Sequence, residues 1–241
     1  MKQIVFVLFT ALRFANCRQQ NCGRDAELGE LPYHASLQFY DTNEHFASAA
    51  ILNARWVLST ARDLVGRSAD SVNIILGAIQ HDKPISIQRS SEIRIHPMYD
   101  AVRMMNDIAT IRGSFAINFP PLIDSIAMSP FFVDVGTPTQ FSGWNPFTTA
   151  HPSILQVTDL EIVPCINSDS MTFTGNQMCA KLIGQEKSLI ESCRRDPGSF
   201  LVANNMLVGI NFQHSVAGEN SLFGFSRIST YRSWIMGNIP I

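Results

Sequence analysis

Short β-type segments separated by turn residues constrain the fold of this 241-residue chain more than any other feature. Turn clusters rich in Gly, Pro, Asn and Asp, such as residues 41–43 and 143–146, separate the segments. Many short strands at this spacing favour an antiparallel barrel or sandwich over an alternating βα fold. The runs with β-type composition are 33–40, 45–52, 56–59, 72–76, 85–95, 137–142 and 155–163.

One segment late in the chain has a helical pattern instead. Ile228, Tyr231 and Ile235 recur at near-helical spacing, which predicts a helix over residues 229–237 with one face against the body. Residues 114–129 are marked by prolines and weakly patterned, as expected for a connection between two halves. The length suits one all-β unit, since barrels and sandwiches often reach about 200–250 residues.

The first 17 residues are typical of a secretory signal peptide. Lys2 is an early positive charge, and the apolar run 4–12 is too short to span a membrane. Ala15 and Cys17 are small residues suited to the cleavage site, which leaves residues 18–241 as the mature chain. The alternative, a hydrophobic core strand, is disfavoured by the terminal position.

Composition supports a secreted globular protein. Charged residues make up only 16% of the chain, below the typical ~25%. Loss of Lys2 and Arg13 with the signal peptide lowers the net charge from −2 to −4. It also lowers the cysteine count from five to four, and an even number suits disulfides in an oxidising compartment. We therefore expect a secreted, extracellular protein.

Several partner and cofactor classes are not expected. The chain has no block of Lys or Arg, so a nucleic-acid partner is not predicted. No segment after the signal peptide reaches the ~18 apolar residues of a membrane helix, so no membrane role is predicted. The sequence contains no phosphate-binding Gly-rich loop, H-E-x-x-H or C-x-x-C pattern. We predict neither a metal nor another cofactor.

Five short motifs together resemble one enzyme family. Residues 193–201 (CRRDPGSFL) resemble the C-x-G-D-S-G-G-P-L signature of chymotrypsin/trypsin-like serine proteases. Residues 45–52 (HFASAAIL) resemble H-F-C-G-G-S-L-I, and residues 56–63 (WVLSTARD) resemble W-V-L-T-A-A-H-C. Residues 96–100 and 106–111 (HPMYD and NDIATI) resemble H-P-x-Y and N-D-I-A-L-I. Each motif is weak alone, but their order and separation are specific over about residues 20–239.

The resemblance implies an all-β fold of two six-stranded antiparallel Greek-key barrels followed by a C-terminal helix. Barrel one would span about residues 28–115 and barrel two about residues 130–227. The helix would span about residues 229–237. Residues 18–241 would thus form one trypsin-like peptidase domain after the signal peptide at 1–17.

The family's catalytic positions are altered here. The His, Asp and Ser positions of the triad fall at Arg62, Asp107 and Pro197. A guanidinium stays protonated at physiological pH, and proline has neither a hydroxyl nor a backbone N–H. The resemblance places the oxyanion donors at Arg195 and Pro197. We further expect Arg62 to form a charge-assisted pair with Asp107.

These substitutions lead us to predict that the chain is not an enzyme. We expect a secreted, non-catalytic serine protease homologue that acts by protein binding. It would serve as a regulator or decoy in a protease pathway, with a protease, an inhibitor or a protease substrate as partner. A trypsin-like endopeptidase with unorthodox residues remains an alternative, for example with Ser199 and His214, and so does a structural extracellular protein.

The resemblance also locates a specificity pocket. Glu191 occupies the position of the aspartate that gives trypsin its preference for Lys or Arg, although it could equally be a solvated loop acid. The strand beside the substrate backbone would be Phe212, Gln213 and His214, and Phe223 would fill the pocket where small residues are usual.

Activation and disulfides also differ from the family pattern. Residues 20–23 lack the Ile-Val-Gly-Gly terminus whose amine pairs with the aspartate at position 196, so we expect a zymogen-like state. The family pairing implies a Cys165–Cys179 disulfide. For the remaining mature cysteines we predict a Cys22–Cys193 bridge, with an intermolecular link or free thiols as alternatives.

Overall fold

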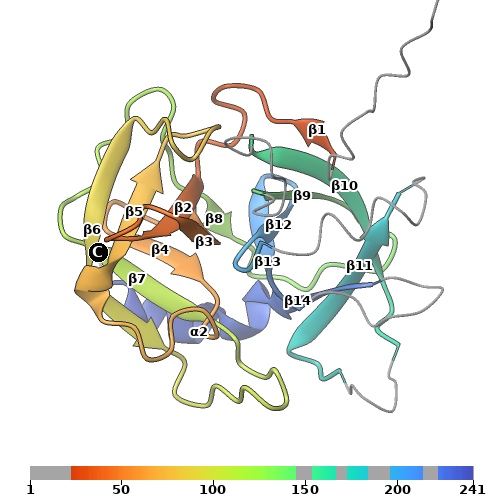
Figure 1. Cartoon of the computed structure of the whole chain (residues 1–241). Helices are drawn as coiled ribbons and strands as arrows, with labels where there is room; N and C mark the ends of the chain where they lie inside the picture. Colours follow the sequence, from red (N-terminus) through yellow and green to blue (C-terminus); the bar gives the residue numbers. More distant parts are fainter. Residues whose placement is uncertain (1–22, 145–153, 167–172, 184–195, 214–221, 241) are drawn as a thin grey trace, which may run out of the picture.

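A computed structural model of the chain describes residues 23–144, 154–166, 173–183, 196–213 and 222–240. Its strands form two adjacent units, drawn on the left and the right of Figure 1, with one α-helix below them. The strands of the first unit are β2 (His34–Phe39), β3 (His45–Ile51), β4 (Trp56–Ser59), β5 (Val72–Leu76), β6 (Ser86–Ile95) and β7 (Ala109–Gly113). Those of the second are β9 (Pro138–Gly143), β10 (Gln156–Val163), β11 (Gln177–Leu182), β12 (Phe200–Ala203), β13 (Met206–Gln213) and β14 (Phe223–Arg227). The remaining elements are β1 (Arg24–Asp25), η1 (Ala69–Ser71), β8 (Ala127–Met128) and α2 (Ile228–Asn238).

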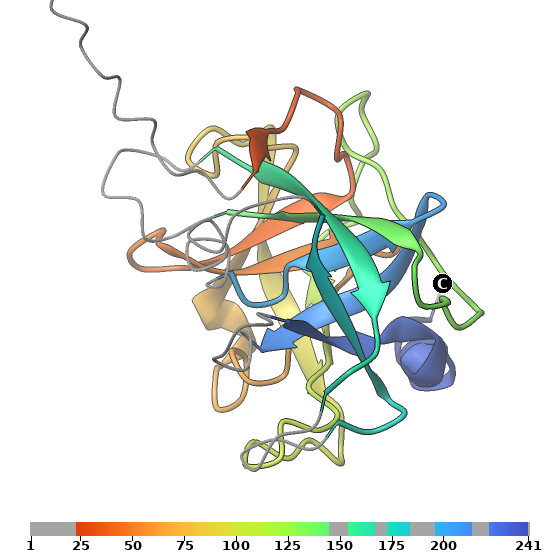
Figure 2. The ribbon, with the colours of Figure 1, turned by 90° about the vertical axis from the view of Figure 1, so that its right-hand side faces the viewer.

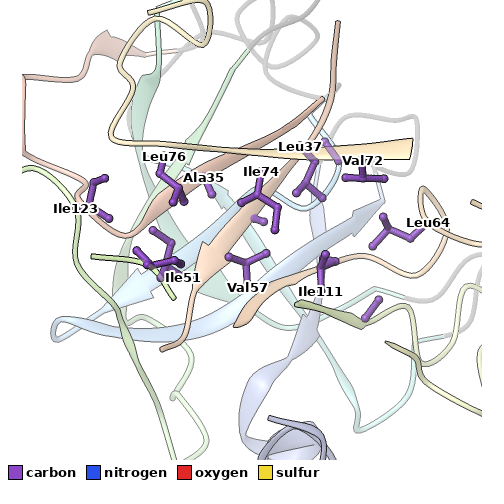
Figure 3. Packing of buried hydrophobic residues seen from close by; sticks show 14 of the residues in the cluster. Ala35, Leu37, Ile51, Val57, Leu64, Val72, Ile74, Leu76, Ile111 and Ile123 are labelled. Carbon is purple, nitrogen blue, oxygen red and sulfur yellow. The ribbon is translucent and has the colours of Figure 1, made fainter. Parts of the chain in front are cut away.

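Barrel one closes in the order β2-β3-β4-β7-β6-β5. Figure 3 shows its apolar side chains meeting inside the barrel, among them Leu37, Ile51, Ile74 and Ile111. All four are at most 1% exposed. Alternate residues of a strand point to one face, so the inward-facing residues of six strands can fill the barrel. The hydrophobic effect of this burial stabilises the barrel.

Barrel two closes through β9-β10-β11-β14-β13-β12, because β9 pairs with both β10 and β12. Its core contains Phe141, Phe223 and Phe225, whose rings lie with centroids 5.7–6.5 Å apart. The short strand β1 adds to β10, and β8 adds in parallel to β13. Figure 2 shows the second barrel from its own side, with α2 at the lower right.

The structure confirms the predicted fold class. Both barrels have six antiparallel strands, and the predicted helix over 229–237 is α2 at Ile228–Asn238. The β-type runs predicted from the sequence coincide with strands β2 to β6, β9 and β10. The predicted disulfide is also present, with Cys165 and Cys179 joined at an S–S distance of 2.09 Å.

A third apolar cluster joins the barrels to the helix. It includes Trp56 of barrel one, Phe200 of barrel two and Tyr231 of α2. The Tyr231 hydroxyl donates to Asn106 Oδ1 at 3.2 Å, and Arg94 Nη1 donates to the Asn238 carbonyl oxygen at 2.7 Å. The helix is therefore held by packing and by hydrogen bonds to barrel one. Among the residues the structure describes, no helix is long and apolar enough to cross a membrane.

The docking of α2 yields a stability prediction. Ile235 is fully buried in the third cluster, whereas its neighbour Met236 is 48% exposed. We expect Ile235→Ala to lower the free energy of unfolding by about 2–5 kcal/mol, because it leaves a cavity between helix and barrels. The matched Met236→Ala variant should change it by less than about 0.5 kcal/mol. Urea unfolding of both variants measures the difference, and equal losses would contradict this docking.

Candidate functional site

The three positions that the resemblance equates with a catalytic triad lie where the two barrels meet. Arg62 follows β4 and Asp107 precedes β7, so both come from barrel one. Pro197 precedes β12 of barrel two, and its carbonyl oxygen accepts the Ser48 N–H of β3 at 2.7 Å. The Arg62 N–H donates to Asp107 Oδ1 at 2.8 Å. All three residues thus take part in contacts at this junction.

Asp107 is a buried carboxyl group, only 1% exposed. Burial raises its pKa to about 7, although the Arg62 N–H bond and the Arg62 charge act in the opposite direction. Ser226 Oγ of β14 donates to the Asp107 carbonyl oxygen at 3.1 Å. Asp107 is therefore fixed by both barrels and titrates near neutral pH.

The Arg62 side chain does not form the predicted ion pair with Asp107. Its Nη1 donates instead to the Phe212 carbonyl oxygen of β13 at 2.6 Å. Its Nε lies 3.6 Å from Asp63 Oδ2, and the side chain is 37% exposed. Only the backbone of Arg62 reaches Asp107, because the guanidinium turns toward barrel two. The prediction failed because the Phe212 carbonyl is a long-range neighbour that local sequence does not reveal.

Residues 196–199 form a tight turn that explains the proline. The Ser199 N–H donates to the Asp196 carbonyl oxygen at 3.3 Å, and Gly198 has a φ of +75°. Proline at the second position and a positive-φ glycine at the third are typical of a type II turn. Pro197 therefore has a conformational role in this chain. Ser199, weighed above as an alternative nucleophile, is fully buried.

The Asp196 carboxylate binds three donors inside the protein. His45 Nε2 lies 3.1 Å from Oδ1, and Ser48 Oγ donates to Oδ2 at 2.7 Å. The Trp144 N–H also donates to Oδ2. Asp196 is 5% exposed, so these bonds compensate for the cost of burying its charge. The resemblance implies that the Asp196 carboxylate pairs with the amine of a new N-terminus. In this structure, donors from both barrels bind this carboxylate.

His34 is a buried second histidine in this hydrogen-bond network, and it contacts Ser48. Its Nε2 lies 3.0 Å from Ser48 Oγ, and its Nδ1 lies 3.0 Å from Ser142 Oγ. The ring stacks on Phe200 at 4.5 Å and meets Trp144 edge-on at 4.8 Å. Burial lowers the pKa of His34 to about 3, so the ring is neutral at physiological pH. Sequence reasoning missed His34, because its partners come from distant strands.

The pocket residues predicted from the sequence fall into two groups. Phe212 is buried on β13, and Phe223 packs in the core of barrel two. Gln213 ends β13, while Glu191 and His214 lie outside the described residues, as does Arg195, which was predicted as an oxyanion donor. The predicted Cys22–Cys193 bridge also lies outside them. Within the described ranges, no group of three or more His, Cys, Asp or Glu side chains is placed to hold a metal ion.

Comparison with known proteins identifies the family. The family model described as Trypsin matches residues 20–235, and the chain belongs to this trypsin family. It is 28% identical over 225 residues to Chymotrypsin-2 of Vespa crabro, covering 90% of this chain and 98% of that protein. Trypsin alpha of Drosophila melanogaster is 26% identical, covering 89% and 85%. Trypsin II-P29 of Gallus gallus is 27% identical, covering 87% and 84%.

These relatives contradict the prediction that the chain is not an enzyme. The matched proteins carry the names of proteases and align with nearly the whole chain. The structure also contains a hydrogen-bonded histidine, serine and aspartate, in which His34 and Asp196 both bond to Ser48. The prediction was drawn from residues that differ from the family motifs, and it was wrong: the chain is a member of a protease family.

The turn at Pro197 yields a prediction about Gly198. A Cβ at this position would lie 2.1 Å from the Ser48 carbonyl oxygen and would require the strained positive φ. We expect Gly198→Ala to lower the free energy of unfolding by about 2–3 kcal/mol. Gly136 also has a positive φ but no atom near its Cβ position, so Gly136→Ala should cost only about 1 kcal/mol. Denaturant melts measure both, and equal costs would show that the Ser48 contact is unimportant.

The buried His34 predicts acid sensitivity. Its folded-state pKa of about 3 lies below its ordinary value of 6.5, so the unfolded state binds more protons. The resulting stability is present above pH 6.5 and is lost as pH falls toward 3, by an amount on the order of 4 kcal/mol. His34→Gln should flatten this decline, whereas the partly exposed His96→Gln should alter it little. Parallel stability profiles for wild type and His34→Gln between pH 7 and 3 would refute the assignment.

Proposed function

We propose that this trypsin-family chain acts outside the cell by binding a protein of a protease pathway, as a regulator or decoy. The partner is a protease, a protease inhibitor or a protease substrate. We expect neither nucleic acid nor a membrane as partner. The proposal concerns binding, and it holds whether or not the chain also cleaves peptides.

The proposal rests on the hydrogen bonds that residues 62, 196 and 197 form across the junction of the two barrels. The Arg62 guanidinium, the Asp196 carboxylate and the Pro197 carbonyl all bond to the opposite barrel. These bonds link the two barrels and so favour one arrangement of their junction. A surface that is already ordered loses little conformational entropy when a partner binds, which favours affinity.

Secretion is part of the proposal. The N-terminal segment 1–17 has the composition of a signal peptide, and the Cys165–Cys179 disulfide is typical of an oxidising compartment. Membership of the trypsin family agrees with this location.

A second candidate function is that of a trypsin-like serine endopeptidase. The names of the relatives favour it. A guanidinium does not give up its proton at neutral pH, and proline carries no hydroxyl. Hydrolysis would therefore need a base and a nucleophile other than the residues at positions 62 and 197.

Affinity capture and activity assays together distinguish the two candidates. We expect the immobilised mature chain to retain one protein saturably from its native secretion, as judged by mass spectrometry. Heat-unfolded chain is the control for nonspecific retention. Peptide cleavage and fluorophosphonate labelling are measured on the same preparation. Absence of a retained protein, together with turnover abolished by one Ser→Ala change, would reject the binding role and support the endopeptidase.

A further inference from the structure

A fixed positive charge lies at the junction of the two barrels. The Arg62 guanidinium is anchored by the Phe212 carbonyl at 2.6 Å and is 37% exposed. A guanidinium has five N–H donors, and one such bond leaves several free. Within the described part of the chain, no other hydrogen bond is formed by this side chain. Arg62 therefore keeps N–H donors that no described residue accepts.

Neighbouring carboxyl groups compensate this charge only in part. Asp63 Oδ2 is 3.6 Å from Arg62 Nε, beyond hydrogen-bond distance, and it accepts the Thr60 hydroxyl at 2.9 Å. Burial raises the pKa of Asp107 to about 7, which reduces its negative charge near neutral pH, and burial also raises the pKa of Asp63. The Arg62 charge is thus available to an external anion.

A second cation lies on the same loop. The Arg67 guanidinium sits over the rings of Phe39 and Phe46, with 4.6 and 4.5 Å to the ring centroids. Its Nε donates to the Asp63 carbonyl oxygen. The ring contacts and this bond restrict the side chain, so the loop holds two ordered positive charges five positions apart. Two fixed cations complement a segment with more than one acidic side chain.

We propose that Arg62 recognises a carboxylate side chain on an acidic segment of the partner protein. The inference rests on the proposed binding function and specifies the chemistry of its partner. The planar guanidinium matches the geometry of a carboxylate, and the resulting hydrogen bonds are strengthened by charge. Because Phe212 already orients the side chain, little further ordering is needed on binding. Arginine is also among the residues that most often dominate protein interfaces.

Two matched peptides test the proposal. The probe is fluorescent Gly-Glu-Glu-Glu-Gly with blocked ends, and its control is the Gln counterpart. On the full mature chain we expect the Glu peptide to bind at least about tenfold more tightly than the Gln peptide. Arg62→Gln should abolish this difference, and Arg62→Lys, which keeps the charge but not the planar guanidinium, should retain only part of it. Arg55→Gln, which removes the same charge at the opposite end of β4, should leave it unchanged.

A gain-of-binding variant guards against misfolding as an explanation. Asp63→Asn removes the carboxylate that lies 3.6 Å from the Arg62 guanidinium and should tighten binding of the Glu peptide about threefold or more. Equal affinity for the two peptides, or an Arg62→Gln variant that binds the Glu peptide as wild type does, would overturn the proposal.

Capture from the native secretion separates this inference from the proposed function. A partner retained equally by wild type and Arg62→Gln would uphold the binding role and refute the role of Arg62. Selective binding of the Glu peptide without any retained protein would support Arg62 and refute the binding role.

Discussion

The buried carboxylate of Asp196 is the constraint on which the junction of the two barrels depends. An ionised carboxylate removed from water needs several donors, and His45, Ser48 and Trp144 provide them from both barrels. The close approach of Trp144 is possible because Gly143 precedes it: a Cβ there would lie 2.7 Å from Asp196 Oδ2. The donors, the glycine and the turn at 196–199 therefore form one interdependent arrangement.

Sequence periodicity was sufficient to predict strands of the barrels, but not the side-chain contacts at the junction between the barrels. Runs such as 72–76 and 155–163 show their strand character locally, because composition and turn residues act over a few positions. The side-chain partner of Arg62 could not be predicted in this way. Its acceptor, the Phe212 carbonyl, lies 150 positions away, and only the closed barrels bring the two together. The family resemblance located the candidate site, yet it did not indicate which acceptor a substituted side chain would bind.

The contacts of Pro197 and Arg62 also explain why the activity prediction needed correction. Pro197 and Arg62 were interpreted as losses, because each lacks a group that the family motif contains. In the structure each has a positive role, Pro197 in a turn and Arg62 as a donor to barrel two. A motif mismatch identifies a changed residue, whereas its contacts reveal what the new residue does. Function at this junction is therefore better argued from the groups present than from those missing.

The position of α2 has a consequence for biogenesis. Its buried residues complete an apolar cluster shared by both barrels, yet α2 is the last element of the described chain to be synthesised. On the ribosome barrel one can form while this cluster is still open to solvent, whereas barrel two needs β14, which ends at Arg227 directly before α2. Non-local packing of this kind delays completion of the fold and leaves apolar surface exposed meanwhile. The cluster that includes Trp56 and Phe200 is therefore completed only when β14 has closed barrel two and the helix has docked.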